Sequence, residues 1–417
     1  MSDNCFWLHE SFVGVHGSCS LAEANFYAVV NGANDISTVV SDGAGGVFVA
    51  GRSGSTTSQF WKIGSGGDLA FARKSTTSIY GIDVATAGSD VFILSAGTHS
   101  TLQKYDTSGS LQWSYRYAQG TTSTPTKVKV SPYDSRILIA GRTSTRKFVL
   151  NLNTDGTVNW NRYHPSSNTN GSTGLAVDSS GNIYYAGNGV STAYVAKFTP
   201  SGSTTWKKTF TSAGGLAAQA IAVDASGNVA VAGWDFTAGY ARGMLVYLNS
   251  SGVFQWGRTL SLGPTDSIYA YDVAFDAAGD VYICGQVDVT NDYPFLAKYS
   301  AGGVRQYTRT FYQSLANASQ YFWRVQAESD GNLYISTDLR EDGFSGIGGV
   351  LKVPADGSLT GTYGTYSYLA LGGLTSNTVT YTVSNDANTY SSFTFSKSTP
   401  TVTESALTIT LSTQIIG

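Results

Sequence analysis

The sequence has little charge and few cysteines. Charged residues make up 13% of the 417 residues, and the formal net charge is −3. That share is about half the usual one, and the balance gives no reason to expect nucleic acid as a partner. Three cysteines do not form a disulfide framework. Cys284 lies in a predicted strand as a small core residue, whereas pairing of Cys5 with Cys19 stays open.

Membrane-spanning and export segments are also missing. No run of 18 apolar residues is present, so we expect no transmembrane helix and no membrane insertion. The first 20 residues have neither the basic region nor the continuous apolar region of a signal peptide. The sequence therefore predicts synthesis in a cytoplasm. Its surface, rich in Ser, Thr, Gly and Asn, nevertheless resembles that of proteins that work outside cells.

The motifs of the common catalytic and metal sites are absent as well. The sequence contains no GxSxG, HExxH or P-loop motif. Its four histidines, His9, His16, His99 and His164, form no HxxxH or His/Cys pair. We therefore predict that the protein is not an enzyme and has no catalytic residues, metal site or cofactor.

What the sequence does have is glycine, aromatic residues and a repeat. The stretch LAVDSSGNIYYAG, residues 175–187, is a strand, a tight turn and a second strand. It recurs in related form ending at Gly51, Gly233 and Gly285. The turn residues of this first hairpin recur at Gly45, Ser89, Ser135, Gly181, Gly227, Gly279 and Gly331, and a second hairpin follows with its own glycine at Gly67, Gly109, Gly156, Gly202, Gly252, Gly303 and Gly357.

Seven units in one phase, each with two hairpins, predict the fold. A unit of four strands is the size of a propeller blade, and a ring of blades buries the faces that a single blade leaves exposed. We predict an all-β protein, a seven-bladed β-propeller of four-stranded blades over residues 37–365. We expect an N-terminal β arm at 1–36 and a C-terminal β appendage or assembly arm at 366–417, which together form a small β appendage.

Three positions recur in the second hairpin of the units. A lysine stands before the glycine of this hairpin, and an aromatic residue stands after the glycine. A cation follows two residues after the aromatic residue. The aromatic predicts a wedge between blades, and the cation predicts a solvated edge that discourages strand addition; a ring of cations that holds an anionic polymer is the alternative. The members are Lys62, Lys104, Lys197, Lys298 and Lys352; Phe71, Trp113, Trp160, Trp206, Trp256 and Tyr307; and Arg73, Arg162, Lys208, Arg258 and Arg309. Gly361 breaks the aromatic series in the last unit.

An acidic residue opens the first turn of five units. These residues are Asp42, Asp178, Asp224, Asp276 and Glu328. A calcium site would need further carboxylates at the spacing of a calcium loop, which are missing. An aspartate at the start of a turn caps backbone N–H groups, so we favour that role.

The segments VDSSGNIYYAG and VDASGNVAVAG, each followed by a hairpin like YVAKFTPSGSTTW, resemble the bacterial and phage seven-bladed β-propeller repeat family. The resemblance covers roughly residues 37–365. It implies the fold, and it implies occurrence in extracellular bacterial proteins or in phage structural proteins, including tail hub or nozzle proteins. It implies no reaction.

The loops between the second and third strands lengthen in the last three units, at 234–243, 286–294 and 337–349. They gather aromatic and charged residues on one side of one face, which suits sugar or protein contacts. Packing against a neighbouring subunit or the tail is the alternative. The candidate binding residues are Trp234, Asp235, Tyr240, Asp288, Asp292, Tyr293, Arg340 and Asp342.

These features predict a non-enzymatic structural component of a phage particle, most simply of the tail. Its partners would be other virion proteins and copies of itself, and it would be located in the virion. The alternative is an extracellular or cell-surface adhesin or lectin-like propeller that binds a cell-surface glycan or receptor.

Overall fold

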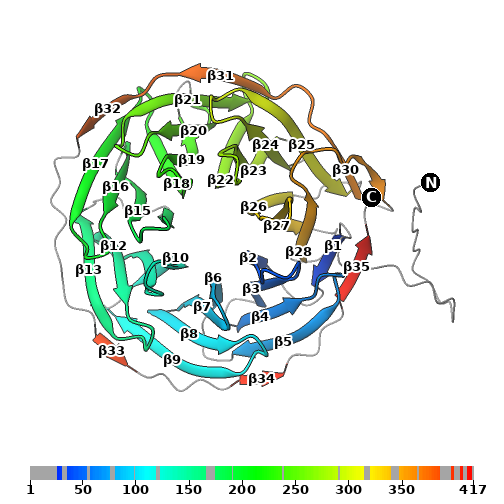
Figure 1. Ribbon diagram of the computed structural model, residues 1–417. Helices are drawn as coiled ribbons and strands as arrows, with labels where there is room; N and C mark the ends of the chain where they lie inside the picture. Colours follow the sequence, from blue (N-terminus) through cyan, green and yellow to red (C-terminus); the bar gives the residue numbers. More distant parts are fainter. Residues whose placement is uncertain are drawn as a thin grey trace, which may run out of the picture.

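The computed structural model is a ring of seven antiparallel β-sheets around a central channel (Figure 1). It describes residues 26–30, 35–53, 57–75, 80–97, 99–118, 123–165, 174–189, 191–236, 239–289, 292–313, 320–339, 347–363, 366–385, 396–398, 404–406 and 411–415. No α-helix occurs among them, which confirms the predicted all-β, seven-bladed propeller.

Blades one to three follow one another along the chain, each with its first strand innermost. Blade one comprises β2 (Asp35–Ser41), β3 (Val47–Ser53), β4 (Thr57–Ile63) and β5 (Leu69–Ser75). Blade two comprises β6 (Tyr80–Ala87), β7 (Asp90–Ala96), β8 (Ser100–Asp106) and β9 (Leu111–Ala118). Blade three comprises β10 (Thr124–Val130), β11 (Ile137–Arg142), β12 (Arg146–Leu152) and β13 (Val158–Pro165).

Blades four to six repeat the same order. Blade four comprises β14 (Gly174–Val177), β15 (Ile183–Asn188), β16 (Thr192–Phe198) and β17 (Thr204–Thr211). Blade five comprises β18 (Leu216–Val223), β19 (Val229–Asp235), β20 (Arg242–Leu248) and β21 (Phe254–Ser261). Blade six comprises β22 (Ser267–Phe275), β23 (Val281–Asp288), β24 (Tyr293–Tyr299) and β25 (Arg305–Gln313).

Blade seven takes its outer strand from the other end of the chain. It contains β26 (Gln320–Ala327), β27 (Asn332–Leu339) and β28 (Ile347–Pro354), and its fourth strand is β1 (Phe26–Val30). β1 pairs antiparallel with β28, with Phe26 opposite Lys352. The N-terminal strand therefore belongs to the propeller and closes the ring, in contrast to the arm expected at residues 1–36.

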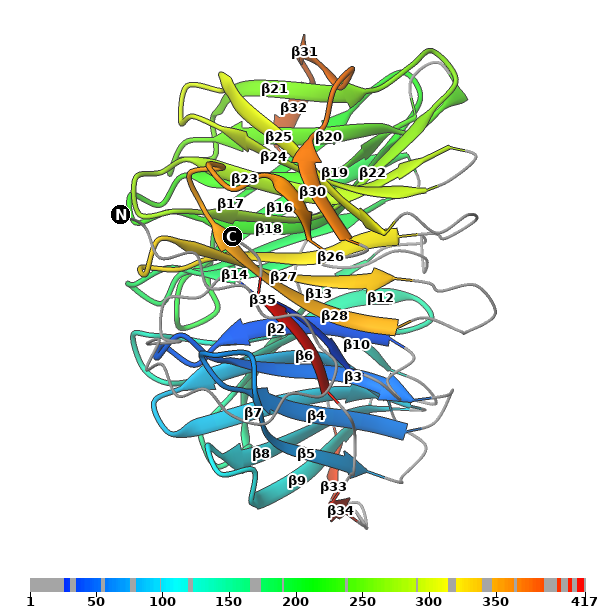
Figure 2. The same ribbon diagram turned by 90° about the vertical axis from the view of Figure 1, so that its right-hand side faces the viewer.

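The C-terminal segment forms a belt around the ring instead of a separate appendage. Its strands are β29 (Gly361–Tyr363), β30 (Tyr366–Ala370), β31 (Thr375–Val379), β32 (Thr382–Asn385), β33 (Ser396–Ser398), β34 (Glu404–Ala406) and β35 (Leu411–Ile415). Six of them, β30 to β35, pair in turn with the outer strands of blades six, five, four, two, one and seven (Figures 1 and 2). Paired outer strands no longer offer free edges to other chains.

The hydrophobic cores lie between neighbouring blades. One core joins Leu245 of blade five to Ile268 and Phe295 of blade six, all fully buried. Cys284 is also fully buried, in the core between blades six and seven, as its place in the strand predicted. Each blade carries apolar residues on both of its faces. Both faces are buried only when the blade has a neighbour on each side, so closing the ring stabilises every blade.

The acidic turn residues cap backbone groups, as predicted. Asp178 Oδ1 accepts the N–H groups of Ser180 and Asn182 at 3.0 and 2.8 Å. The same pair of bonds is made by Asp42, Asp224 and Asp276. Blade seven differs in the residue that caps the turn. Here Asp330, which lies two residues after Glu328, accepts the N–H of Asn332.

The aromatic residue of the fourth strand is a wedge onto the next blade, as predicted. Trp256 packs on Gly303, whose φ is +76°, and its Nε1–H donates to the Ala301 carbonyl at 2.9 Å. Phe71, Trp160, Trp206 and Tyr307 pack in the same way on Gly109, Gly202, Gly252 and Gly357. In blade two, Tyr115 and not Trp113 packs on the next glycine, Gly156.

The cation two residues later fastens the wedge, which corrects the expectation of a solvated edge. The Arg258 guanidinium lies 5.3 Å from the Trp256 ring centroid, and its Nε donates to the Gly303 carbonyl at 3.0 Å. Arg73 donates to the Gly109 carbonyl through Nε, and Arg309 donates to the Gly357 carbonyl through Nη2. These guanidinium groups are occupied between blades, so they do not form a free ring of cations for an anionic polymer.

Gly303→Ala tests the wedge. An alanine held at positive φ costs about 1–2 kcal/mol, and its methyl group would come within 2.7 Å of Trp256. We expect the free energy of unfolding to fall by at least about 1–2 kcal/mol in denaturant titration. Gly302→Ala is the control, because its methyl group would meet only the Ser300 hydroxyl, at 3.8 Å. Equal effects of the two changes would contradict this account.

Val29→Pro tests ring closure by β1. β1 lies between β28 and β35, so a proline removes an N–H from a strand that is paired on both sides. We expect a lower melting temperature, from the loss of at least one hydrogen bond worth about 1 kcal/mol and from disturbance of the paired strands. Val29→Thr keeps the N–H and should melt above the proline variant; a proline variant that melts with the parent would exclude β1 as the closing strand.

Candidate functional site

One face of the ring carries the candidate site. Because each blade is a four-stranded antiparallel meander, the loops between second and third strands share a face with the links between blades. We call this the loop face. The long loops of blades five and six, between β19 and β20 and between β23 and β24, lie on it.

Of the predicted residues on blade five, Trp234 is on the surface and Asp235 is not. Trp234, the penultimate residue of β19, is half-buried, and its ring centroid lies 5.3 Å from that of Tyr269 in blade six. Asp235 is only 2% exposed and accepts a hydrogen bond from Ser212 Oγ at 3.1 Å. Burial and the Asp235 carboxylate together raise the pKa of Tyr381 in the C-terminal belt. Asp235 is therefore a structural residue, and its prediction as a surface contact is wrong.

Tyr240 is exposed on the loop that follows, together with an aromatic that sequence reasoning did not select. Tyr240 is 39% exposed and Phe236 is 42% exposed. Arg242 lies against the Tyr240 ring and donates to three carbonyls of the β21–β22 link, those of Gly263, Pro264 and Asp266. The base of this loop is thus fixed, and its two exposed rings are available to a ligand.

Blade six contributes two carboxylates and a tyrosine. Burial raises the pKa of Asp288, and the nearby Asp292 carboxylate raises it further. Asp292 also reaches blade seven, because its carbonyl accepts the Gln320 N–H and its Oδ2 accepts the Tyr321 hydroxyl at 3.4 Å. Tyr293 packs partly against the core between blades five and six, and burial raises its pKa.

The two predicted residues of blade seven, Arg340 and Asp342, lie outside the described residues. The described part of the site is therefore formed by blades five and six and by the first strand of blade seven.

A row of stacked aromatic rings crosses these three blades, and sequence reasoning missed most of it. Trp234 contacts Tyr269 and Tyr271 edge to face. Tyr271 stacks on Trp323 with centroids 4.7 Å apart, and Trp323 stacks on Tyr321 at 5.3 Å. All five rings are partly exposed. We call this set the aromatic row.

The blade architecture does not require the aromatic row. Six of the innermost strands carry a β-bulge at the same register, and Tyr271 and Trp323 are the extra residues of the bulges in blades six and seven. In blades one, three and five the same position holds Ser37, Thr126 and Gln219. Since those blades form the same sheet without an aromatic, the row is a local addition to the repeat.

The described residues lack two further features. No helix among them is long and apolar enough to cross a membrane. Within the same ranges, no group of three or more His, Cys, Asp or Glu side chains is placed to hold a metal ion.

The fold and this face define a seven-bladed β-propeller with one differentiated sector. No protein-family model matches the sequence, and no curated protein matches it. Among solved structures, it is similar to the Dos1 propeller, with a TM-score of 0.51, 11% identity and coverage of 77% of each chain. A chain of the mitotic checkpoint complex gives a TM-score of 0.52 and 11% identity, over 83% of this chain and 99% of that one. A protein of unknown function from Bacteroides caccae gives 0.42 and 13%, over 68% and 94%. At these identities the likeness shows the fold alone.

Asp292→Asn tests the carboxylate pair. The change removes the like charge that raises the pKa of Asp288, so this pKa should fall but stay above its ordinary value, because burial remains. Carboxyl titration by NMR measures the pKa of Asp288.

The same change should alter how stability depends on pH. A raised carboxyl pKa weakens the fold as pH rises past the ordinary range near 4, so Asp292→Asn should lose less stability than the parent over that rise. Asp266→Asn removes a carboxylate from the same face and should leave Asp288 unchanged; an unshifted Asp288 in Asp292→Asn would contradict the coupling.

Proposed function

We propose that this chain is a non-enzymatic binding propeller that takes a carbohydrate chain on the loop face of blades five to seven. The observation that carries the proposal is the aromatic row. Sugar rings present apolar C–H faces, which pack on flat aromatic side chains, and hydroxyl groups, which donate to carboxylates. The row supplies the first kind of contact, and Asp288 and Asp292 supply the second beside it.

The extent of the row favours a chain of sugars over a single sugar. Its rings come from three successive blades, from Trp234 in blade five to Trp323 and Tyr321 in blade seven. The exposed rings of Phe236 and Tyr240 lie on the loop next to Trp234. Several weak stacking contacts in line bind an extended ligand more tightly than any one of them.

Binding without catalysis fits the placement of the acidic groups. A glycosidase needs two carboxyl groups on opposite sides of the scissile bond, about 5–5.5 or 6.5–9.5 Å apart. Asp288 and Asp292 lie on the same loop and are close enough to share a hydrogen bond. A pair in this arrangement holds a hydroxyl group but does not flank a bond.

A structural role in a phage particle stays a second proposal, and the C-terminal belt is the observation that favours it. The belt occupies the outer strands of six blades. Neighbouring subunits would then contact the two faces of the ring, and a stack of rings is one way to build a tubular particle part. A glycan-binding face and such a stack are compatible when one face stays exposed.

Trp323→Ala tests the proposed function. The parent protein should bind one or more polysaccharides on an array of microbial and host-surface glycans. Loss of one stacked ring costs about 0.5–1.5 kcal/mol, so the affinity for a binding glycan should fall about 2- to 12-fold in calorimetry. Trp234→Ala should weaken binding similarly, and Trp323→Phe should retain most of it.

Trp206→Phe is the matched control, because Trp206 is a wedge at the start of a fourth strand, on the opposite face, and donates to Ser250. It should leave glycan affinity unchanged. A parent protein that binds no glycan, or equal losses in the control and in Trp323→Ala, would end the carbohydrate proposal.

A further inference from the structure

The central channel contains a charged cavity that the loop-face site does not use. Its volume is about 320 Å³, the space of roughly ten water molecules. Five charged residues line it: Asp83, Lys127, Lys129, Asp272 and Arg324. Three cations against two carboxylates give the cavity an excess of one positive charge.

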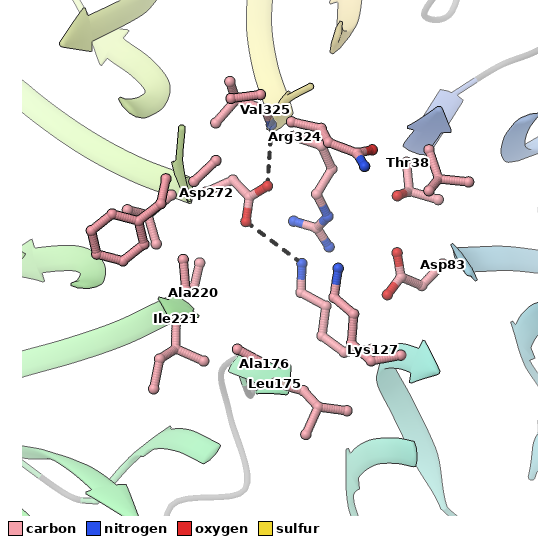
Figure 3. Close-up of a pocket in the computed structure, with 18 of the residues that line it drawn as sticks. Thr38, Asp83, Lys127, Leu175, Ala176, Ala220, Ile221, Asp272, Arg324 and Val325 are labelled. Atoms are coloured by element: carbon pink, nitrogen blue, oxygen red, sulfur yellow. Dashed lines mark hydrogen bonds and ion pairs between the residues drawn. The ribbon is translucent and has the colours of Figure 1, made fainter. Parts of the chain in front are cut away.

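Four of these residues occupy one register position of the innermost strands. Asp83, Lys127, Asp272 and Arg324 each lie immediately after the β-bulge of blades two, three, six and seven. In blades one, four and five the position holds Thr38, Gly174 and Ala220. The charges therefore form one level of the channel, and their side chains point into it (Figure 3).

The two carboxylates are already engaged by the fold. Asp83 Oδ2 accepts the N–H of Val128 in the next blade at 2.8 Å. Asp272 Oδ2 accepts the N–H of Val325 in the next blade at 3.1 Å. Both bonds tie neighbouring innermost strands together, so each carboxylate has only part of its capacity left for the cations.

The remaining acceptor capacity of the two carboxylates pairs poorly with the cations. Lys127 is 6% exposed, and its ammonium lies 3.9 Å from Asp272 Oδ1, at the outer limit of an ion pair. Burial lowers the pKa of Lys127 to about 8, and repulsion from Arg324 is the next largest cause, ahead of the attraction of Asp272 and Asp83. The Arg324 Nε is buried and has no hydrogen-bond partner among the described residues. A buried donor without a partner costs free energy.

We propose that the channel binds a small oxyanion, a phosphate or carboxylate group, between Lys127 and Arg324. The anion would accept hydrogen bonds from the Lys127 ammonium and the Arg324 Nε and would separate two cations that now repel each other. A guanidinium and an ammonium that line the same cavity suit phosphate and carboxylate groups. Lys129, exposed and lining the same cavity, adds a third positive charge. This site is independent of the aromatic row.

The test compares anions and variants on the full chain. Melting temperature and calorimetry are measured with inorganic phosphate and with malonate, against sodium chloride at equal ionic strength. The parent should melt higher in at least one oxyanion, with a saturable rise. Whether phosphate or malonate binds more tightly identifies the group.

Variants of the channel should change the affinity in opposite directions. Lys127→Met and Arg324→Met remove a cation and should lose the anion-specific rise. Asp272→Asn keeps an acceptor for the Val325 N–H but removes a competing charge, so it should bind the anion several-fold more tightly. Lys207→Met is the control, because it removes one cation from β17 on the outer side of blade four, and it should respond like the parent.

Three results would overturn the proposal. The first is a parent that responds to phosphate and malonate no more than to chloride. The second is a Lys127→Met or Arg324→Met protein that binds the anion as the parent does. The third is weaker binding in Asp272→Asn, which would mean that the cluster is a closed network without a place for an anion. If Arg324→Met does not fold, Arg324→Lys keeps the charge without Nε and should bind at least several-fold more weakly.

Discussion

The ring depends on the contact that the fourth strands of blades one to six make with the turn of the following blade. A flat aromatic side chain covers a glycine in the left-handed conformation, and in blades one, five and six an arginine stacked on that ring donates to the glycine carbonyl. The glycine is required twice, for its φ and for the space that the ring fills. This contact repeats from blade one to blade six, so it fixes how neighbouring blades pack and leaves residues elsewhere in the blades able to vary.

The sequence predicted what repeats. Hairpins with a glycine turn and strands in which polar and apolar residues alternate are local patterns. Seven copies in phase predicted the number of blades. The pairing of β1 with β28 and of the belt with the outer strands has no local pattern, because it joins segments far apart in the chain. One position in the sequence indicated this exception. Gly361 stands where the repeat predicts an aromatic residue, and blade seven has no fourth strand of its own at that point.

The candidate site was also predicted only in part, because it joins residues that are far apart in the chain. Loop length pointed to the sector that carries the aromatic row, and Trp234 and Tyr240 lie there at least partly exposed. Tyr269, Tyr271, Tyr321 and Trp323 look like ordinary strand residues in the sequence, where aromatics are common. Tyr271 and Trp323 stand out only when their register is compared with that of Ser37, Thr126 and Gln219 in other blades. Asp235 shows the converse, a polar loop residue that the fold buries.

The position of β1 also sets the order in which the molecule can be completed. Phe26 pairs with Lys352 on one side and with Ile415 on the other. During synthesis β1 must wait unpaired until β28, which ends at Pro354, has left the ribosome. Contacts of such long sequence separation make folding slow, and blades one to six can form while blade seven is still open. The growing chain is therefore most exposed to aggregation just before β28 is made.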